Sequence, residues 1–104
     1  MGGYRSRLEI IADVLDVVAK RARKTQIMYQ ANLSYGSLIK YLAQAREAYL
    51  IRFEHRERRF VLTPKGEEFL QKYREYTEHN QRIERQISEI NGKKKMLEEL
   101  CLGT

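Results

Sequence analysis

Apolar residues recur at helical spacing in three successive runs of the first fifty residues, and each run predicts a helix. The first run covers about residues 6–21. Its apolar stripe consists of Leu8, Ile11, Ala12, Leu15, Val18, Ala19 and Ala22. Ser6, with Glu9 three residues later, has the spacing of a capping box that starts this helix. Arg23 and Lys24 then break the pattern, so we expect the helix to end before them.

The second and third runs are separated by Asn32-Leu33-Ser34, which interrupts the helical pattern. Thr25 opens the second helix, and its buried side is predicted to be Ile27, Met28 and Ala31. Ser34 is a suitable N-cap for a third helix through about residue 48. Its inner stripe is predicted to be Leu38, Leu42, Ala45 and Tyr49, with Ile39 beside it. We expect Tyr29 and Tyr35 to pack in the core between these two helices.

Two short runs follow, and they predict a β-hairpin. Residues 50–54 alternate apolar and charged side chains from Ile51 onward, and residues 59–62 form the second run. The tip at residues 55–58 contains no glycine, so we expect a turn longer than two residues. Thr63-Pro64 starts another helix, because threonine is a suitable N-cap and proline is favoured at the first helical position.

The order helix, helix, helix, hairpin, helix is that of a winged helix. In that fold the second and third helices form a helix-turn-helix and the hairpin forms the wing. We therefore predict a mainly α chain of the α+β type. Residues 1–63 are expected to form the winged-helix domain, and residues 64–104 a long C-terminal helix that mediates dimerisation.

The last helix carries a heptad pattern of apolar residues. Its a and d positions form an unbroken seam over more than four heptads: Phe69, Tyr73, Tyr76, Asn80, Ile83, Ile87, Ile90, Lys94, Leu97 and Cys101. A single helix cannot bury so narrow a stripe, so the seam predicts a coiled coil with a second copy of the chain. The alternative is an amphipathic helix folded back on its own domain. Asn91-Gly92 is a point at which the helix could end or kink.

Polar residues in the seam favour an antiparallel homodimer. In a parallel pair Lys94 would face Lys94, and facing lysines repel each other. An antiparallel pair that crosses near Arg85 instead sets Ile83 against Ile87 and Tyr76 against Lys94. The tyrosine ring can then cover the lysine stem and attract its ammonium.

The net charge of +6 is confined to one part of the chain. Residues 1–62 contain 12 Lys and Arg against 6 Asp and Glu, whereas residues 63–104 contain 8 of each. A basic module joined to a charge-balanced one suggests a head that binds a polyanion and a structural stalk. The alternative, a merely soluble basic protein, cannot be separated from this reading by charge alone.

Four groups of polar side chains lie where a winged helix would contact DNA. They are an N-terminal arm that begins at Tyr4, the start of the second helix beside its free backbone N–H groups, the outer face of the third helix, and the hairpin tip. The candidates are Arg5, Arg7, Lys24, Thr25, Gln26, Ser37, Lys40, Tyr41, Gln44, Arg56, Arg58 and Arg59. On the third helix they recur at i, i+3, i+4 and i+7, a face that can reach phosphates and base edges in a major groove. Ordinary solvated surface is the alternative for each group alone.

Residues typical of catalysis are sparse. His55 and His79 are isolated, and Asp13 and Asp16 read as solvated surface. The single cysteine, Cys101, allows no intrachain disulfide and no cysteine-based zinc site. We expect no enzymatic activity, no cofactor, no metal and no small-molecule ligand. No apolar run approaches a membrane span and no secretory signal is visible, so we expect a cytoplasmic, nucleoid-associated protein without a membrane partner.

Three segments resemble a known family. Residues 24–35 (KTQIMYQANLSY) look like the helix-turn-helix signature of archaeal winged-helix regulators, with the 10a family of small chromatin-associated proteins as the nearest match. Residues 6–11 and residues 62–68 resemble it as well, so the similarity extends to about residue 80. The arginine-rich hairpin tip and the Asn91-Gly92 and Lys93-Lys94-Lys95 segments depart from it.

The resemblance implies dimeric binding of double-stranded DNA with modest sequence preference, and an antiparallel coiled coil. Our first hypothesis is therefore an architectural, chromatin-associated protein that binds largely through phosphates. A sequence-specific transcriptional regulator is the alternative within DNA binding, and Gln44 is the one good candidate for reading bases. A protein-interaction module tethered by a coiled coil is the alternative of another class.

Overall fold

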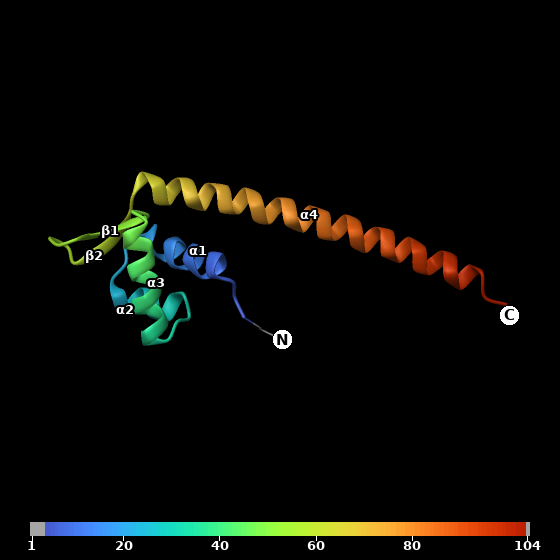
Figure 1. Cartoon of the computed structure of the whole chain (residues 1–104), viewed down its shortest axis with the longest axis horizontal. Coiled ribbons are helices and arrows are strands. Elements are labelled where there is room, and N and C mark those ends of the chain that lie inside the picture. Colours follow the sequence, from blue (N-terminus) through green and yellow to red (C-terminus); the bar gives the residue numbers. More distant parts are fainter. Residues whose placement is uncertain (1–3, 104) are drawn as a thin grey trace. The chain divides into compact units, whose positions relative to one another are not determined.

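The computed structural model describes residues 4–103 and contains six elements in the predicted order (Figure 1). They are α1 (Arg7–Val18), α2 (Lys24–Gln30), α3 (Tyr35–Glu47), β1 (Ile51–Glu54), β2 (Arg59–Leu62) and α4 (Pro64–Leu100). The mainly α winged-helix arrangement followed by a long C-terminal helix is thus confirmed. The chain divides into two compact units, of which the first ends at Tyr73, ten residues into α4.

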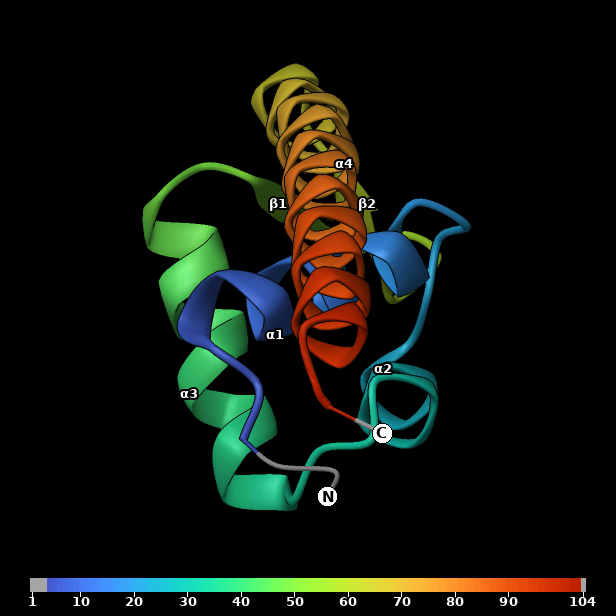
Figure 2. The same ribbon diagram turned by 90° about the vertical axis from the view of Figure 1, so that its right-hand side faces the viewer.

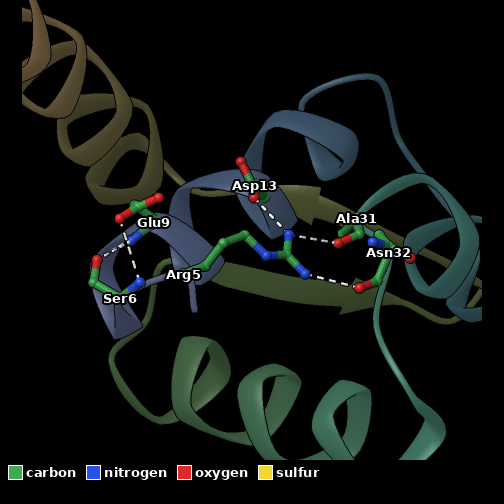
Figure 3. A network of polar contacts seen from close by, with 6 residues as sticks. All are labelled: Arg5, Ser6, Glu9, Asp13, Ala31 and Asn32. Atoms are coloured by element: carbon green, nitrogen blue, oxygen red, sulfur yellow. Dashed lines mark hydrogen bonds and ion pairs between the residues drawn. The ribbon is translucent and has the colours of Figure 1, made fainter. Parts of the chain in front are cut away.

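The predicted caps start α1 and α3. The Ser6 hydroxyl accepts a hydrogen bond from the Glu9 backbone N–H at 3.1 Å, and the Glu9 carboxylate accepts one from the Ser6 N–H at 3.3 Å (Figure 3). Ser34 likewise accepts from the Ser37 N–H at 3.2 Å. These bonds satisfy backbone donors that have no partner within the helix. α1 ends three residues earlier than expected, because the chain turns at Arg21, where φ is 58°.

The hairpin pairs its two strands in antiparallel register, with Ile51 opposite Leu62 and Glu54 opposite Arg59. Its four-residue tip is longer than two residues, as predicted. The hairpin is also fastened to the segment between α1 and α2. The Ala22 N–H donates to the Phe60 carbonyl at 3.2 Å, and the Phe60 N–H donates to the Ala22 carbonyl at 2.8 Å. The wing is therefore hydrogen-bonded to the helical part of the domain.

The core of the first unit forms where α1 packs against both α2 and α3 (Figure 2). It includes Val14, which the predicted stripe left out and which is fully buried. Three residues predicted to be inside, Leu8, Ala19 and Tyr49, are exposed instead. Ala19 is the C-cap of α1, where the helix has already ended. Leu8 lies in the first turn of α1, one turn before the core begins at Ile11. Tyr49 follows the end of α3 with φ at 58°, so the chain has left the helix and its ring points away from the stripe.

Tyr29 and Tyr35 are not core residues, contrary to the prediction. Their exposed fractions are 77% and 63%. The buried contacts of the helix-turn-helix come instead from Ile27, Ala31 and Leu38, which are between 0% and 2% exposed. Both rings therefore remain on the surface of the domain.

Helix α4 begins on a well-anchored first turn. The Thr63 hydroxyl accepts from the Gly66 N–H at 3.1 Å, and the Lys65 ammonium donates to the Ala48 carbonyl at 2.8 Å. Gly66 packs so closely that an added Cβ would lie 2.1 Å from the Leu50 carbonyl oxygen. The helix then continues through Asn91-Gly92 to Leu100 without a break. Within residues 4–103, no helix is both long enough and apolar enough to cross a membrane.

Candidate nucleic-acid interface

A groove of about 410 Å³ opens between the start of α2, the last turn of α3 and the hairpin. Its lining consists of Arg23, Lys24, Thr25, Arg46, Phe53, Arg58 and Phe60. Four of these seven residues are cationic, and none is acidic. We call this feature the basic groove.

Two phenylalanines stiffen the basic groove on its wing side. Phe53 and Phe60 are cross-strand partners, and their rings meet edge to face with centroids 5.0 Å apart. Phe60 is buried, and its backbone is the one paired with Ala22. The apolar wall is therefore tied both to the sheet and to the segment that leads into α2.

A second group of cations lies at the wing tip, around a recess of about 390 Å³ lined by Arg23, Arg56, Glu57, Arg58 and Arg59. Arg23 and Arg58 line both features, so the two are continuous. The only acidic side chain here, Glu57, is within 3.5 Å of Arg21. Arg58 occupies the turn with φ at 54°. Together the two features form one basic surface.

The cations of the basic groove are electrostatically unsatisfied. Within residues 4–103, the side chains of Arg23, Arg46 and Arg58 make no ion pair with a carboxylate. Like charges that converge without counter-charges raise the local positive potential and favour a bound anion. The arrangement is suited to phosphate groups, because guanidinium presents several N–H donors in a planar fork.

The structure brings some of the predicted residues together in this surface. Lys24, Thr25 and Arg58 line the basic groove, and Arg56 and Arg59 lie at the wing tip. Sequence reasoning missed two members. The sequence pattern marks Arg23 only as a break between helices, although it adjoins Lys24. Arg46 lies outside the predicted polar face of α3, so its spacing in the sequence did not mark it as part of the site.

The predicted outer face of α3 is only partly the exposed one. Ser37, Tyr41 and Gln44 are half-buried, and the Arg7 guanidinium donates to the Gln44 side-chain oxygen at 2.8 Å, on the flank next to α1. Lys40 is exposed, with its ammonium 5.3 Å from the centroid of the Tyr41 ring. The exposed residues of α3 are Tyr35, Gly36, Ile39, Lys40, Ala43, Arg46 and Glu47. The surface of the helix is thus turned further toward the basic groove than the polar pattern suggested.

Two further candidates, Arg5 and Gln26, make hydrogen bonds to other residues of the chain. The Arg5 guanidinium donates to the Asp13 carboxylate and the Ala31 carbonyl, both at 2.7 Å, and to the Asn32 carbonyl at 2.8 Å (Figure 3). It therefore joins the segment before α1 to the end of α2. Gln26 accepts a hydrogen bond from the Arg23 backbone N–H at 2.9 Å and so holds the start of α2.

The chain belongs to the winged helix-turn-helix family, whose model matches residues 4–81. Among solved structures, it is similar to Sso10a-2, described as a DNA-binding protein from Sulfolobus solfataricus, with a TM-score of 0.63 and 22% sequence identity. That match covers 96% of this chain and 100% of the other. A comparison with curated proteins finds no match.

Proposed function

We propose that this protein binds double-stranded DNA through the basic groove and the adjoining wing tip. The observation that carries the proposal is the convergence of Arg23, Lys24, Arg46 and Arg58 without a facing carboxylate. The fold supports it, because a winged helix offers α3 to the major groove and the hairpin to the neighbouring backbone. The likeness to Sso10a-2, which is described as DNA-binding, points in the same direction.

In this binding mode most of the affinity comes from phosphates. Lys24 and Thr25 at the start of α2, Arg46 on α3 and Arg58 on the wing contact the backbone along one side of the basic groove. Gln44, the best candidate for hydrogen-bonding a base, already accepts a bond from Arg7. Few polar groups are therefore left to read bases, which favours an architectural role with weak sequence preference over that of a sequence-specific regulator.

We further propose that the protein acts as a homodimer through α4. Tyr76, Ile83, Ile87, Ile90 and Leu97 belong to the seam, and each is between 41% and 64% exposed in the single chain. The helix remains continuous over the whole heptad pattern, so it can pair along its length. An antiparallel coiled coil agrees best with the position of Lys94 in the seam, because a parallel pair would set Lys94 against Lys94.

A cytoplasmic, nucleoid-associated protein of the archaeal 10a family is the assignment that fits these features together. The match to Sso10a-2 supports it, because it spans nearly all of both chains, including the long helix. The alternative of a purely protein-binding module is less favoured, because the unpaired cations of the basic groove suit an anionic partner such as the phosphates of DNA.

The salt dependence of DNA binding tests the proposal. Affinity should be measured for several unrelated duplexes over a series of salt concentrations, with the full chain. We expect similar affinities for all duplexes and a log–log slope of about −0.9 for each phosphate contacted. Weak affinity that does not respond to salt would contradict the phosphate-binding role, and the absence of binding to every duplex would favour the protein-interaction alternative.

A further inference from the structure

The exposed side of α3 carries an apolar row that has no role in the fold. Tyr35, Ile39 and Ala43 follow one another at four-residue spacing, so they share one side of the helix. All three are exposed, and neither Tyr35 nor Ile39 belongs to the core or packs against it. By contrast, the inward-facing Leu38 and Leu42 are 1% and 4% exposed. The apolar row is thus available for contact with another molecule.

Cations border the apolar row. The Lys24 ammonium lies 5.6 Å from the centroid of the Tyr35 ring, and Lys40 is the chain neighbour of Ile39. Arg46, three residues after Ala43, lines the basic groove. One carboxylate, that of Glu47, also lies on the exposed side, eight residues and about 12 Å along the helix from Ile39. An apolar centre with a cationic border fits a partner that is apolar in the middle and anionic at its edges.

We propose that Ile39, flanked by Tyr35 and Ala43, contacts the C5-methyl groups of thymine in the major groove. The thymine methyl is the apolar group that base edges present there, and phosphates run along both sides of that groove. This inference rests on the proposed DNA binding and adds to it the group that is read. It gives the protein a preference for thymine-containing steps without any hydrogen bond to a base.

The preference is modest by its nature. Removing one buried methyl group from water is worth about fourfold in affinity, so a few such contacts give a bias and not a strict target sequence. This agrees with the small number of polar groups on α3 that are free to read bases. Ile39 is the main determinant, because it is the branched apolar side chain at the middle of the row.

Replacing thymine by uracil in the DNA tests the contact directly. Two duplexes of the same A·T-rich sequence are compared, one with thymidine and one with deoxyuridine, which lacks only the C5-methyl group. At one fixed salt concentration, the full chain should bind the thymidine duplex about fourfold more tightly or better. Ile39→Ala should reduce this ratio to less than about twofold, and Ile39→Val should retain most of it.

Matched measurements separate the possible failures. Arg58→Ala should weaken binding to both duplexes and leave the ratio unchanged, and circular dichroism should show that every variant is folded. Equal affinity of the parent chain for the two duplexes would overturn the inference but leave the proposed function intact. A ratio unchanged in Ile39→Ala would also overturn it, because the discrimination would then arise from the duplex. Absence of binding to both duplexes contradicts the proposed function itself.

Discussion

Arg5 and Arg58 are both predicted DNA contacts, but their surroundings in the structure differ. Arg5 donates to one carboxylate and two carbonyl groups, whereas Arg58 faces the basic groove without an acidic partner. An arginine whose N–H groups are already bonded to the protein has less to offer a phosphate. The two residues therefore separate a stabilising role from a binding role.

Removing Arg5 should destabilise the protein and leave DNA binding nearly intact. Arg5→Ala breaks three hydrogen bonds, one to Asp13 in α1 and two to the carbonyls of Ala31 and Asn32 at the end of α2. Its side chain is 30% exposed, so we expect a modest loss of about 1–2 kcal/mol in the free energy of unfolding. Thermal unfolding measures the loss, and a binding titration well below the midpoint should show less than about a twofold change. A large drop in DNA affinity with unchanged stability would indicate that Arg5 contacts DNA after all.

Removing Arg46 or Arg58 should have the opposite effect. Each substitution by alanine takes one phosphate contact from the basic groove, so affinity should fall by roughly fivefold for every duplex and the salt slope should decrease by about 0.9. Arg52→Ala is a matched control, because Arg52 alternates with Phe53 along β1 and projects from the other face of the wing. Equal losses in all three variants would indicate that general charge, and not the basic groove, sets the affinity.

Three residues at the start of α4 together fix the position of its first turn. Thr63 caps the helix, Lys65 reaches the end of α3, and Gly66 allows the backbone to approach Leu50. Residues 62–68 also carry part of the family resemblance. Their role is to fix the start of α4 where the wing ends, and only the structure shows the close approach that requires glycine.

Two glycines in α4 should respond oppositely to alanine. At Gly66 a Cβ would lie 2.1 Å from the Leu50 carbonyl oxygen, so Gly66→Ala should cost about 1–3 kcal/mol in the free energy of unfolding. Gly92 has nothing within 4 Å and lies inside the helix, so Gly92→Ala should add about 0.5–1 kcal/mol. Thermal unfolding of the two variants provides the comparison. A destabilised Gly92→Ala protein would mean that the helix does not continue through this position.

The elements were largely predictable from the sequence, because the signals for them are local. Apolar spacing, the Ser6 and Ser34 caps and the Thr63-Pro64 start each depend on residues within one helical turn. The predictions that were wrong concern the direction in which individual side chains point. Tyr49 lies in the continuation of the α3 stripe, but the chain leaves the helix just before it, with φ at 58°. Nothing in the pattern of apolar residues shows such a turn when no glycine marks it.

The candidate site was less predictable, because it is assembled from residues far apart in the chain. Arg23, Arg46 and Arg58 come from a loop, a helix and a hairpin turn, and they meet only when the wing is folded beside α2 and α3. Arg7 and Gln44 show the converse. The sequence predicts both as DNA contacts, yet they bond to each other across 37 positions of sequence. Which polar side chains stay available is decided by tertiary contacts that spacing does not encode.

At the scale of the whole molecule, the proposed antiparallel dimer makes a prediction about Cys101. With the crossing near Arg85, Cys101 lies 16 residues along α4, so the two thiols would be about 48 Å apart. A parallel pair would place them side by side, near the distance of a disulfide. Cys101 is a free, exposed cysteine in the single chain, so its own surroundings do not prevent oxidation.

Mild oxidation followed by a non-reducing gel distinguishes the two arrangements, provided that sedimentation first shows a dimer in solution. We expect no disulfide to form, so that the chains of the solution dimer run as monomers on the gel. The reason is that the antiparallel register pairs Cys101 with Phe69 of the other chain. As a positive control, the double variant Ile83→Cys/Ile87→Cys in a Cys101→Ser background sets one thiol opposite another in the seam beside the crossing point, where crosslinking should be efficient. Rapid Cys101 crosslinking at low protein concentration would rule out the antiparallel arrangement and favour a parallel coiled coil in which Lys94 faces Lys94.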